Sequence, residues 1–116
     1  MTPATLIERL QAATGPNYEL DRLVTEVTGY PNLYRRPDGI IPSEATFPAF
    51  TADIDAAIAL LGLLLPQQPV LIGWGQTPQT RPWARIGLHA PMDTTGANIP
   101  IALCIAILKA KEASHD

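Results

Sequence analysis

Three residues in the second half of the chain carry chemistry that suits a small ligand. Trp83, Arg85 and His89 occupy alternate positions of the segment 82–89. Side chains alternate between the two faces of a strand, so we expect these three to share one face, with Gly87 between Arg85 and His89. An indole stacks on a base, a guanidinium forks onto a phosphate, and an imidazole donates a hydrogen bond. The pattern predicts a binding face for a nucleotide-like ligand.

Two neighbours extend this predicted face. Trp74 lies at the end of the preceding apolar segment, and Arg81 lies near the tip of the loop between the two segments. The alternative is purely structural. In that case Trp83 belongs to the core, Arg85 lays its aliphatic stem along a helix, and His89 is a half-buried residue whose hydrogen bonds are satisfied.

Two further segments have polar groups that could hold an anion. Thr94 and Thr95 come shortly before the last helix, where unpaired backbone N–H groups attract phosphate; the alternative is an ordinary capped helix start. Arg35 and Arg36 follow Tyr34, which places an aromatic ring beside two cations. The alternative for this pair is the solvated flank of a turn.

The sequence contains no recognisable catalytic or metal-binding pattern. Cys104, the only cysteine, lies in an apolar run, and His89 and His115 are the only histidines. Asp53 and Asp55 are two residues apart, so on a helix they do not face each other. We therefore expect no catalytic residue, no metal and no cofactor.

Composition limits the class of protein. The chain has 116 residues, a net charge of −3 and 47% hydrophobic residues, which fits a single globular domain over 1–116. Its cations are scattered, whereas duplex nucleic acid needs a basic stripe. The apolar runs are too short to span a bilayer, and the first residues lack the pattern of a signal peptide. We expect a cytoplasmic protein that binds neither duplex nucleic acid nor a membrane.

The periodicity of apolar residues predicts four helices and a hairpin. The first helix begins near Thr2 or Thr5, where Thr5 and Glu8 could form a capping box, and ends before Gly15. The third begins after Thr51 as its N-cap, and Asn98 caps the last. The expected spans are, for helices, up to 14, 18–28, 52–61 and 99–112; for the hairpin strands, 69–75 and 82–89; and for short edge strands, 32–35 and 39–41.

The last predicted helix is apolar on nearly every side until Lys109. Such a helix is either buried by several neighbouring elements or packs against a partner subunit. We therefore expect a homo-oligomer that forms through this C-terminal helix.

Short segments at four helix starts resemble the small phage proteins of the phage ABA sandwich domain family. The segments are Leu6-Ile7-Glu8-Arg9-Leu10 with Ala13-Thr14-Gly15-Pro16, then Glu19-Leu20-Asp21, then Phe50-Thr51-Ala52-Asp53-Ile54-Asp55-Ala56-Ala57, and finally Ala97-Asn98-Ile99-Pro100-Ile101-Ala102-Leu103-Cys104. The resemblance covers nearly the whole chain except 31–48 and the hairpin tip. It implies an α/β (α+β) fold, a three-layer helix/sheet/helix sandwich with a small and largely antiparallel sheet, and a phage or prophage origin. It implies no catalytic residues.

Three functions remain open at this point. The first is a non-enzymatic phage protein that sequesters a nucleotide signal in the host cytoplasm and so counters host defence. The second is a structural or protein-interaction module, with a host protein as partner and no small ligand. The third is a nucleotide-processing enzyme of unrecognised type.

Overall fold

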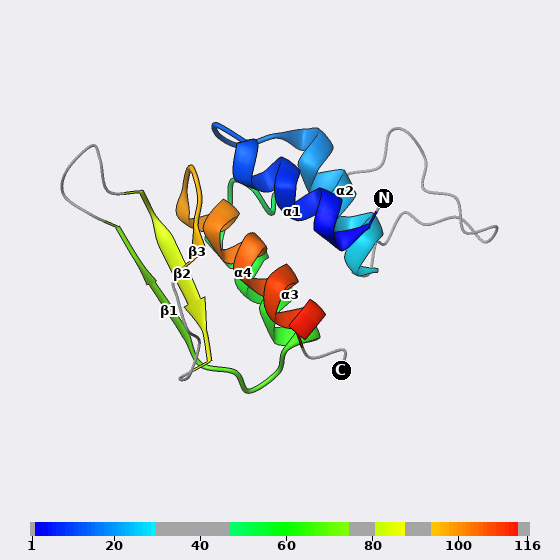
Figure 1. The fold of residues 1–116 in the computed structure, drawn as a ribbon. Helices are drawn as coiled ribbons and strands as arrows, with labels where there is room; N and C mark the ends of the chain where they lie inside the picture. The colour runs from blue at the N-terminus through cyan, green and yellow to red at the C-terminus, as the bar shows by residue number, and fades with distance from the viewer. Residues whose placement is uncertain (1, 30–46, 75–80, 88–93, 114–116) are drawn as a thin grey trace.

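The structure is a computed structural model, and it describes residues 2–29, 47–74, 81–87 and 94–113. The expected edge strands at 32–35 and 39–41 lie outside these ranges. Within them the chain forms four helices and three strands (Figure 1). In chain order these are α1 (Pro3–Ala12), α2 (Tyr18–Thr28), α3 (Ile54–Leu64), β1 (Val70–Gly73), β2 (Trp83–Ile86), β3 (Thr94–Thr95) and α4 (Ile99–Ala113).

The first two helices begin and end at clear local signals. Thr2 caps α1, and its hydroxyl accepts a hydrogen bond from the Thr5 N–H, so the predicted capping box from Thr5 to Glu8 is not used. Asn17 caps α2 by accepting from the Leu20 N–H at 3.0 Å. Gly29 ends α2 with φ at 70°, a left-handed conformation that glycine adopts without a Cβ clash. The span predicted for α2 is confirmed.

The start of α3 differs from the prediction. The N-cap is Asp53, whose carboxylate accepts from the Asp55 N–H, and not Thr51. Thr51 is fully buried, and its N–H and hydroxyl both bond to Asp21 of α2. The predicted start was wrong because a tertiary contact takes the groups that a local cap would use.

The three strands form one antiparallel sheet in the order β1-β2-β3. Val70 pairs with Ile86 and Gly73 with Trp83, which confirms the predicted hairpin. Trp83 also pairs with Thr95 of β3. This short strand was expected to be part of a turn-rich link, and a strand of two residues leaves too little periodicity to recognise.

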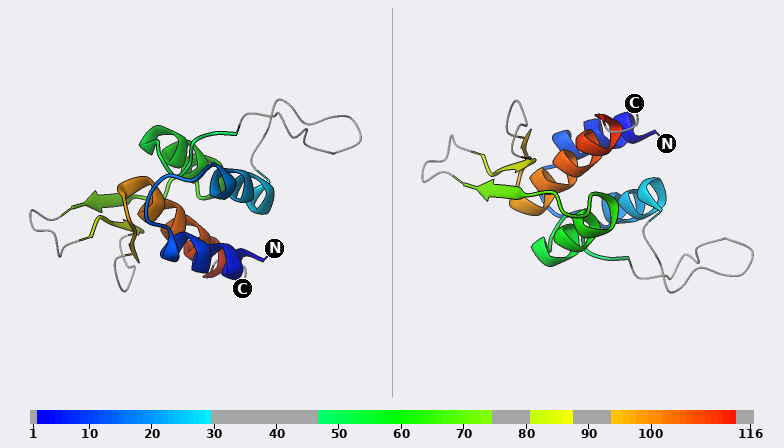
Figure 2. Two further views of the ribbon diagram at one scale, coloured as in Figure 1. Left: turned by 90° about the horizontal axis from the view of Figure 1, so that it is seen from above. Right: turned by 90° about the horizontal axis from the view of Figure 1, so that it is seen from below.

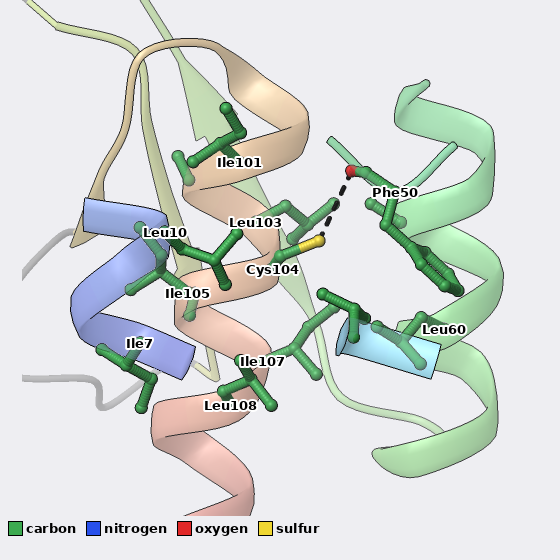
Figure 3. Packing of buried hydrophobic residues seen from close by; sticks show 14 of the residues in the cluster. Ile7, Leu10, Phe50, Leu60, Ile101, Leu103, Cys104, Ile105, Ile107 and Leu108 are labelled. Atoms are coloured by element: carbon green, nitrogen blue, oxygen red, sulfur yellow. Dashed lines mark hydrogen bonds between the residues drawn. The ribbon is translucent and has the colours of Figure 1, made fainter. Parts of the chain in front are cut away.

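Helix α4 is the centre of the core. It contacts α1, α3 and all three strands, and every residue from 101 to 108 is buried. Seen from above, α4 runs between α1 and α3, with the sheet at one end of the molecule (Figure 2). Figure 3 shows Ile7 and Leu10 of α1 on one side of α4 and Phe50 and Leu60 on the other.

The prediction of an α+β fold with four helices and a small antiparallel sheet is confirmed. All the described helices lie on one side of the sheet, with α4 next to the sheet and α1, α2 and α3 beyond it (Figure 1). The helix/sheet/helix order implied by the resemblance is therefore not seen among the described residues, whose outer sheet face carries no helix. Residues 101–108 of α4 are buried within one chain, so they offer no exposed apolar surface for the oligomer contact that was expected through this helix. The oligomeric state itself stays a prediction.

Candidate functional site

The two faces of the hairpin have different roles. Ala84 is fully buried against the core, and Val70 and Ile86 pack beside it, so this face lies on α4. Trp83 and Arg85 lie on the opposite, outer face, as their alternation with Ala84 predicts. This part of the sequence-based prediction is confirmed; His89, which was expected to join them, lies outside the described residues.

The outer face is organised around the contact between Trp83 and Gly73. These residues are directly paired across β1 and β2. A Cβ built on Gly73 would lie only 2.5 Å from Cζ2 of Trp83, so the indole occupies the space above the glycine backbone. Thr95 pairs with Trp83 from the other side. Trp83 is therefore a half-buried packing residue of the sheet, close to the structural alternative considered above.

Trp74 belongs to a different site from Trp83. Val70, Ile72 and Trp74 alternate onto the inner side of β1, and Trp74 is 68% exposed at the rim of an open pocket of about 570 Å³. The pocket lies where β1 and β2 approach the beginnings of α3 and α4. Its other residues, almost all apolar, are Ile54, Pro82, Ala97, Asn98, Ile99 and Pro100. The two tryptophans predicted to share one binding face thus lie on opposite sides of the sheet.

The predicted arginines fall into two groups. Arg81 is exposed and directly precedes Pro82 of the pocket wall, so it is the predicted cation nearest the Trp74 pocket along the chain. Arg85 is on the outer face with Trp83. Arg35 and Arg36 lie outside the described residues.

The anion site expected before α4 has few donors to offer. Thr94 and Thr95 form β3, and Gly96 donates its N–H to Pro82 O at 3.1 Å. At the helix start Pro100 has no N–H, and the Ile101 N–H already bonds to Asn98 Oδ1 at 2.8 Å. The predicted phosphate loop is therefore a strand followed by a capped helix, because sheet pairing and capping use its amides.

Buried polar groups meet at the segment that leads into α3. Thr51 bonds to Asp21 through its N–H and its hydroxyl, each at 2.8 Å, and its carbonyl accepts from Asn98 Nδ2 at 2.9 Å. Burial raises the pKa of the Asp21 carboxyl, and the two bonds from Thr51 oppose that rise. The network joins α2 to the segments that precede α3 and α4. Because it is buried, we interpret its role as stabilising the fold.

Cys104 is not suited to nucleophilic chemistry. Its Sγ is buried 3.5 Å from Phe50 O (Figure 3). Burial, helped by the negative charge of Asp21, raises the pKa of the Cys104 thiol to about 12. At neutral pH the side chain is a thiol and not a thiolate. In the described ranges there is also no group of three or more His, Cys, Asp or Glu side chains placed to hold a metal ion.

A second, smaller pocket lies between the end of α1 and the start of α2. It has a volume of about 360 Å³, and Arg9, Thr14 and Asn17 contribute its polar groups. The Asn17 N–H bonds to Thr51 Oγ1 and its side chain caps α2, so the backbone there is already paired.

From the sequence we identified Trp74, and Arg81 next to the wall residue Pro82, but missed the other residues that line the Trp74 pocket. Ile54, Ala97 and Pro100 look like ordinary apolar or helix-start residues, and they come together only through the packing of α3, the hairpin and α4. The one available signal was the alternation of Val70, Ile72 and Trp74, which places Trp74 on the face opposite Trp83 once the strands are paired.

Comparison with known proteins adds no relative. No protein-family model, no curated protein and no solved structure matches this chain. The resemblance to the phage ABA sandwich family therefore stays a prediction. None of the helices in the described ranges has both the length and the apolar character needed to cross a bilayer.

Proposed function

We propose that this protein is a non-enzymatic binding protein whose Trp74 pocket takes a nucleotide-like ligand. One observation carries the proposal: the Trp74 indole is 68% exposed at the rim of a pocket of about 570 Å³. Tryptophan is normally well buried, and stacking a base on an aromatic ring stabilises a complex by about 1–3 kcal/mol. The volume is within the range of small-molecule sites.

The other residues around the pocket support a ligand with one flat and one anionic end. Ile54, Ile99 and Pro100 offer an apolar surface for a base. Arg81, beside the wall residue Pro82, can pair with a phosphate through its guanidinium. The resemblance to phage proteins adds a setting to the proposal: sequestration of a nucleotide signal in the host cytoplasm, and so interference with host defence.

Tryptophan fluorescence tests the proposal directly. The chain has only two tryptophans, so Trp83→Phe leaves Trp74 as the single reporter. We expect saturable quenching of this variant by nucleotides, tested with AMP, ADP-ribose and a cyclic dinucleotide. Trp74→Ala should abolish binding measured by calorimetry, whereas Leu63→Ala, which truncates an exposed apolar residue of α3 elsewhere, should retain it. Absence of saturable binding by all three nucleotides would count against the proposal.

Two further measurements define the ligand and the type of protein. Arg81→Gln should weaken AMP binding and leave adenosine binding unchanged if Arg81 holds the phosphate. Denaturing the complex and weighing the released nucleotide separates a binder from an enzyme: intact nucleotide supports a binder, and a converted product supports the enzyme alternative.

A protein-interaction module is the second candidate, because exposed apolar residues continue beyond the pocket. Ile72 of β1 is 37% exposed on the same face as Trp74, and Ile58, one turn beyond Ile54 on α3, is 44% exposed. A protein partner could cover this larger surface. Capture of one host protein by the native chain but not by Trp74→Ala, together with no nucleotide binding, would favour this function.

A further inference from the structure

Strand β1 has a free edge with hydrogen-bonding groups that face outward. It pairs only with β2 among the described strands, because the order is β1-β2-β3. The Gly87 N–H donates to Pro69 O at 2.8 Å, which makes Pro69 and Gly87 a hydrogen-bonded pair. Such pairs alternate along an antiparallel ladder, so Leu71 and Gly73 bond to β2. The N–H and C=O groups of Val70 and Ile72 therefore point away from the sheet.

Within Val70–Gly73 the β1 edge lacks the charges and prolines that normally prevent strand pairing. Natural edges are protected by charged residues, proline, bulges or very short strands. The Val70–Gly73 strand contains no charge and no proline, and the sequence has no charged residue between Asp55 and Arg81. The opposite edge differs, since β3 has only two residues, both threonine.

The side chains on this edge are apolar and accessible to solvent. Leu71 is 47% exposed on the outer face and Ile72 is 37% exposed on the inner face. Burying such side chains is favourable by about 25 cal/mol per Å² of apolar surface. An occupant of this edge would therefore gain both backbone hydrogen bonds and apolar contacts.

We propose that two copies of this chain dimerise by antiparallel pairing of their β1 strands. The outward groups of Val70 and Ile72 are two residues apart, so a two-fold axis at Leu71 places Val70 opposite Ile72 of the second copy. Each such pair exchanges two hydrogen bonds, and the symmetry gives two equivalent pairs. The three-stranded sheets then join into one six-stranded sheet.

The same register puts the two copies of Leu71 directly opposite each other. They form a non-hydrogen-bonded pair, in which the Cα atoms are about 4.5 Å apart and the side chains contact. A strand that is complementary to itself in both backbone and side chains fits a second copy without any other partner. The assembly uses the sheet edge and leaves α4 in the core.

Light scattering after size exclusion tests the dimer. We expect the mass of the native chain to approach that of two chains as its concentration rises. Leu71→Lys puts two cations opposite each other and should yield a monomer. Leu63→Lys makes the same change at a residue that is 50% exposed on α3, and this control should still dimerise. Circular dichroism and the unfolding temperature check that both variants fold.

Disulfide trapping tests the register independently of the charge variants. Cα atoms about 4.5 Å apart are within the range that a disulfide can join. Leu71→Cys should form a covalent dimer under mild oxidation, whereas Leu63→Cys and Ile72→Cys should not, since Ile72 faces Val70 and not itself. A native chain that stays monomeric at every concentration, or equal cross-linking of the three variants, would overturn the proposal. Loss of nucleotide binding has no bearing on either result.

Discussion

Thr51 and Asp21 lie 30 residues apart in the chain and are joined by two hydrogen bonds in the buried interior. The Thr51 N–H and hydroxyl both donate to Asp21 Oδ1, each at 2.8 Å. The Thr51 carbonyl accepts from Asn98 Nδ2, so one residue ties α2 to the starts of α3 and α4. The beginning of α4 is also part of the Trp74 pocket, and the network therefore supports the wall of the candidate site.

Removing the Asp21 carboxylate should destabilise the fold. In Asp21→Ala the Thr51 hydroxyl can still donate to Asn17 O, 3.3 Å away, but the buried Thr51 N–H loses its acceptor. An unsatisfied buried donor costs about 1–3 kcal/mol. We expect the free energy of unfolding to fall by that amount in urea denaturation. The control is Asp55→Ala, which removes an exposed carboxylate and should change the free energy of unfolding much less.

The charge of Asp21 should make stability depend on pH. Its pKa is raised in the folded protein, mainly by burial, so the folded state favours the protonated form. The contribution of this group is therefore fully present below the ordinary carboxyl pKa and is lost as the pH rises through the raised value. Asp21→Asn keeps an uncharged oxygen acceptor and lacks this titration.

The comparison of Asp21→Asn with the native chain measures that effect. Between pH 3 and pH 7 the difference in unfolding free energy should shift in favour of the asparagine variant. A constant difference across this range would contradict the raised pKa.

The thiol of Cys104 should be inert in the folded protein. Because burial raises its pKa to about 12, almost no thiolate forms at neutral pH, and the surrounding core excludes reagents. We expect no reaction with a thiol reagent under native conditions and one equivalent in guanidinium chloride. In the Leu63→Cys variant, the added thiol lies at a position of α3 that is 50% exposed and should react rapidly in the native state, which provides an internal control for the reagent.

The local parts of the fold could be predicted from the sequence. Asn17 and Gly29 are strong boundary signals, and they predict α2 to the residue. The start of α3 could not be predicted from local signals because Thr51 and Asp53 are both good N-caps. Only the contact with Asp21, made from another helix, decides between them.

The candidate site was predictable only in part, for a related reason. Alternation along one strand correctly separates Trp83 and Arg85 from Ala84. The position of Trp74 relative to Trp83 depends on how β1 pairs with β2. The observed pairing places Gly73, and not Trp74, opposite Trp83. The remaining pocket residues are distant in sequence, so no spacing could indicate them.

A side chain at position 73 should destabilise the protein, because the Trp83 indole lies over the Gly73 backbone. In Gly73→Ala the new Cβ would lie 2.5 Å from the Trp83 ring, so the ring or the strand must move. Overpacking of this kind costs about 1–3 kcal/mol. Gly62→Ala is the control, because a Cβ at position 62 would have no atom within 4 Å. Gly62 lies inside α3, where alanine is favoured over glycine, so we expect this change to stabilise the protein by about 0.5–1 kcal/mol. In a Trp83→Leu background the penalty of Gly73→Ala should shrink, and a full penalty there would show that the ring is not its cause.

Asn98 should contribute to stability through two separate bonds. Its Oδ1 accepts from the Ile101 N–H and caps α4, while its Nδ2 donates to Thr51 O. Asn98→Ala loses both bonds, whereas Asn98→Ser keeps a cap acceptor for the Ile101 N–H and loses the amide that donates to Thr51 O. A lost N-cap costs about 0.5–2 kcal/mol, so Asn98→Ala should lower the unfolding free energy by more than Thr2→Ala, which removes an exposed cap of α1 and no tertiary bond. Asn98→Ser should fall between the native chain and Asn98→Ala in urea denaturation. Equal losses for Asn98→Ala and Thr2→Ala would mean that the bond to Thr51 adds nothing to the cap.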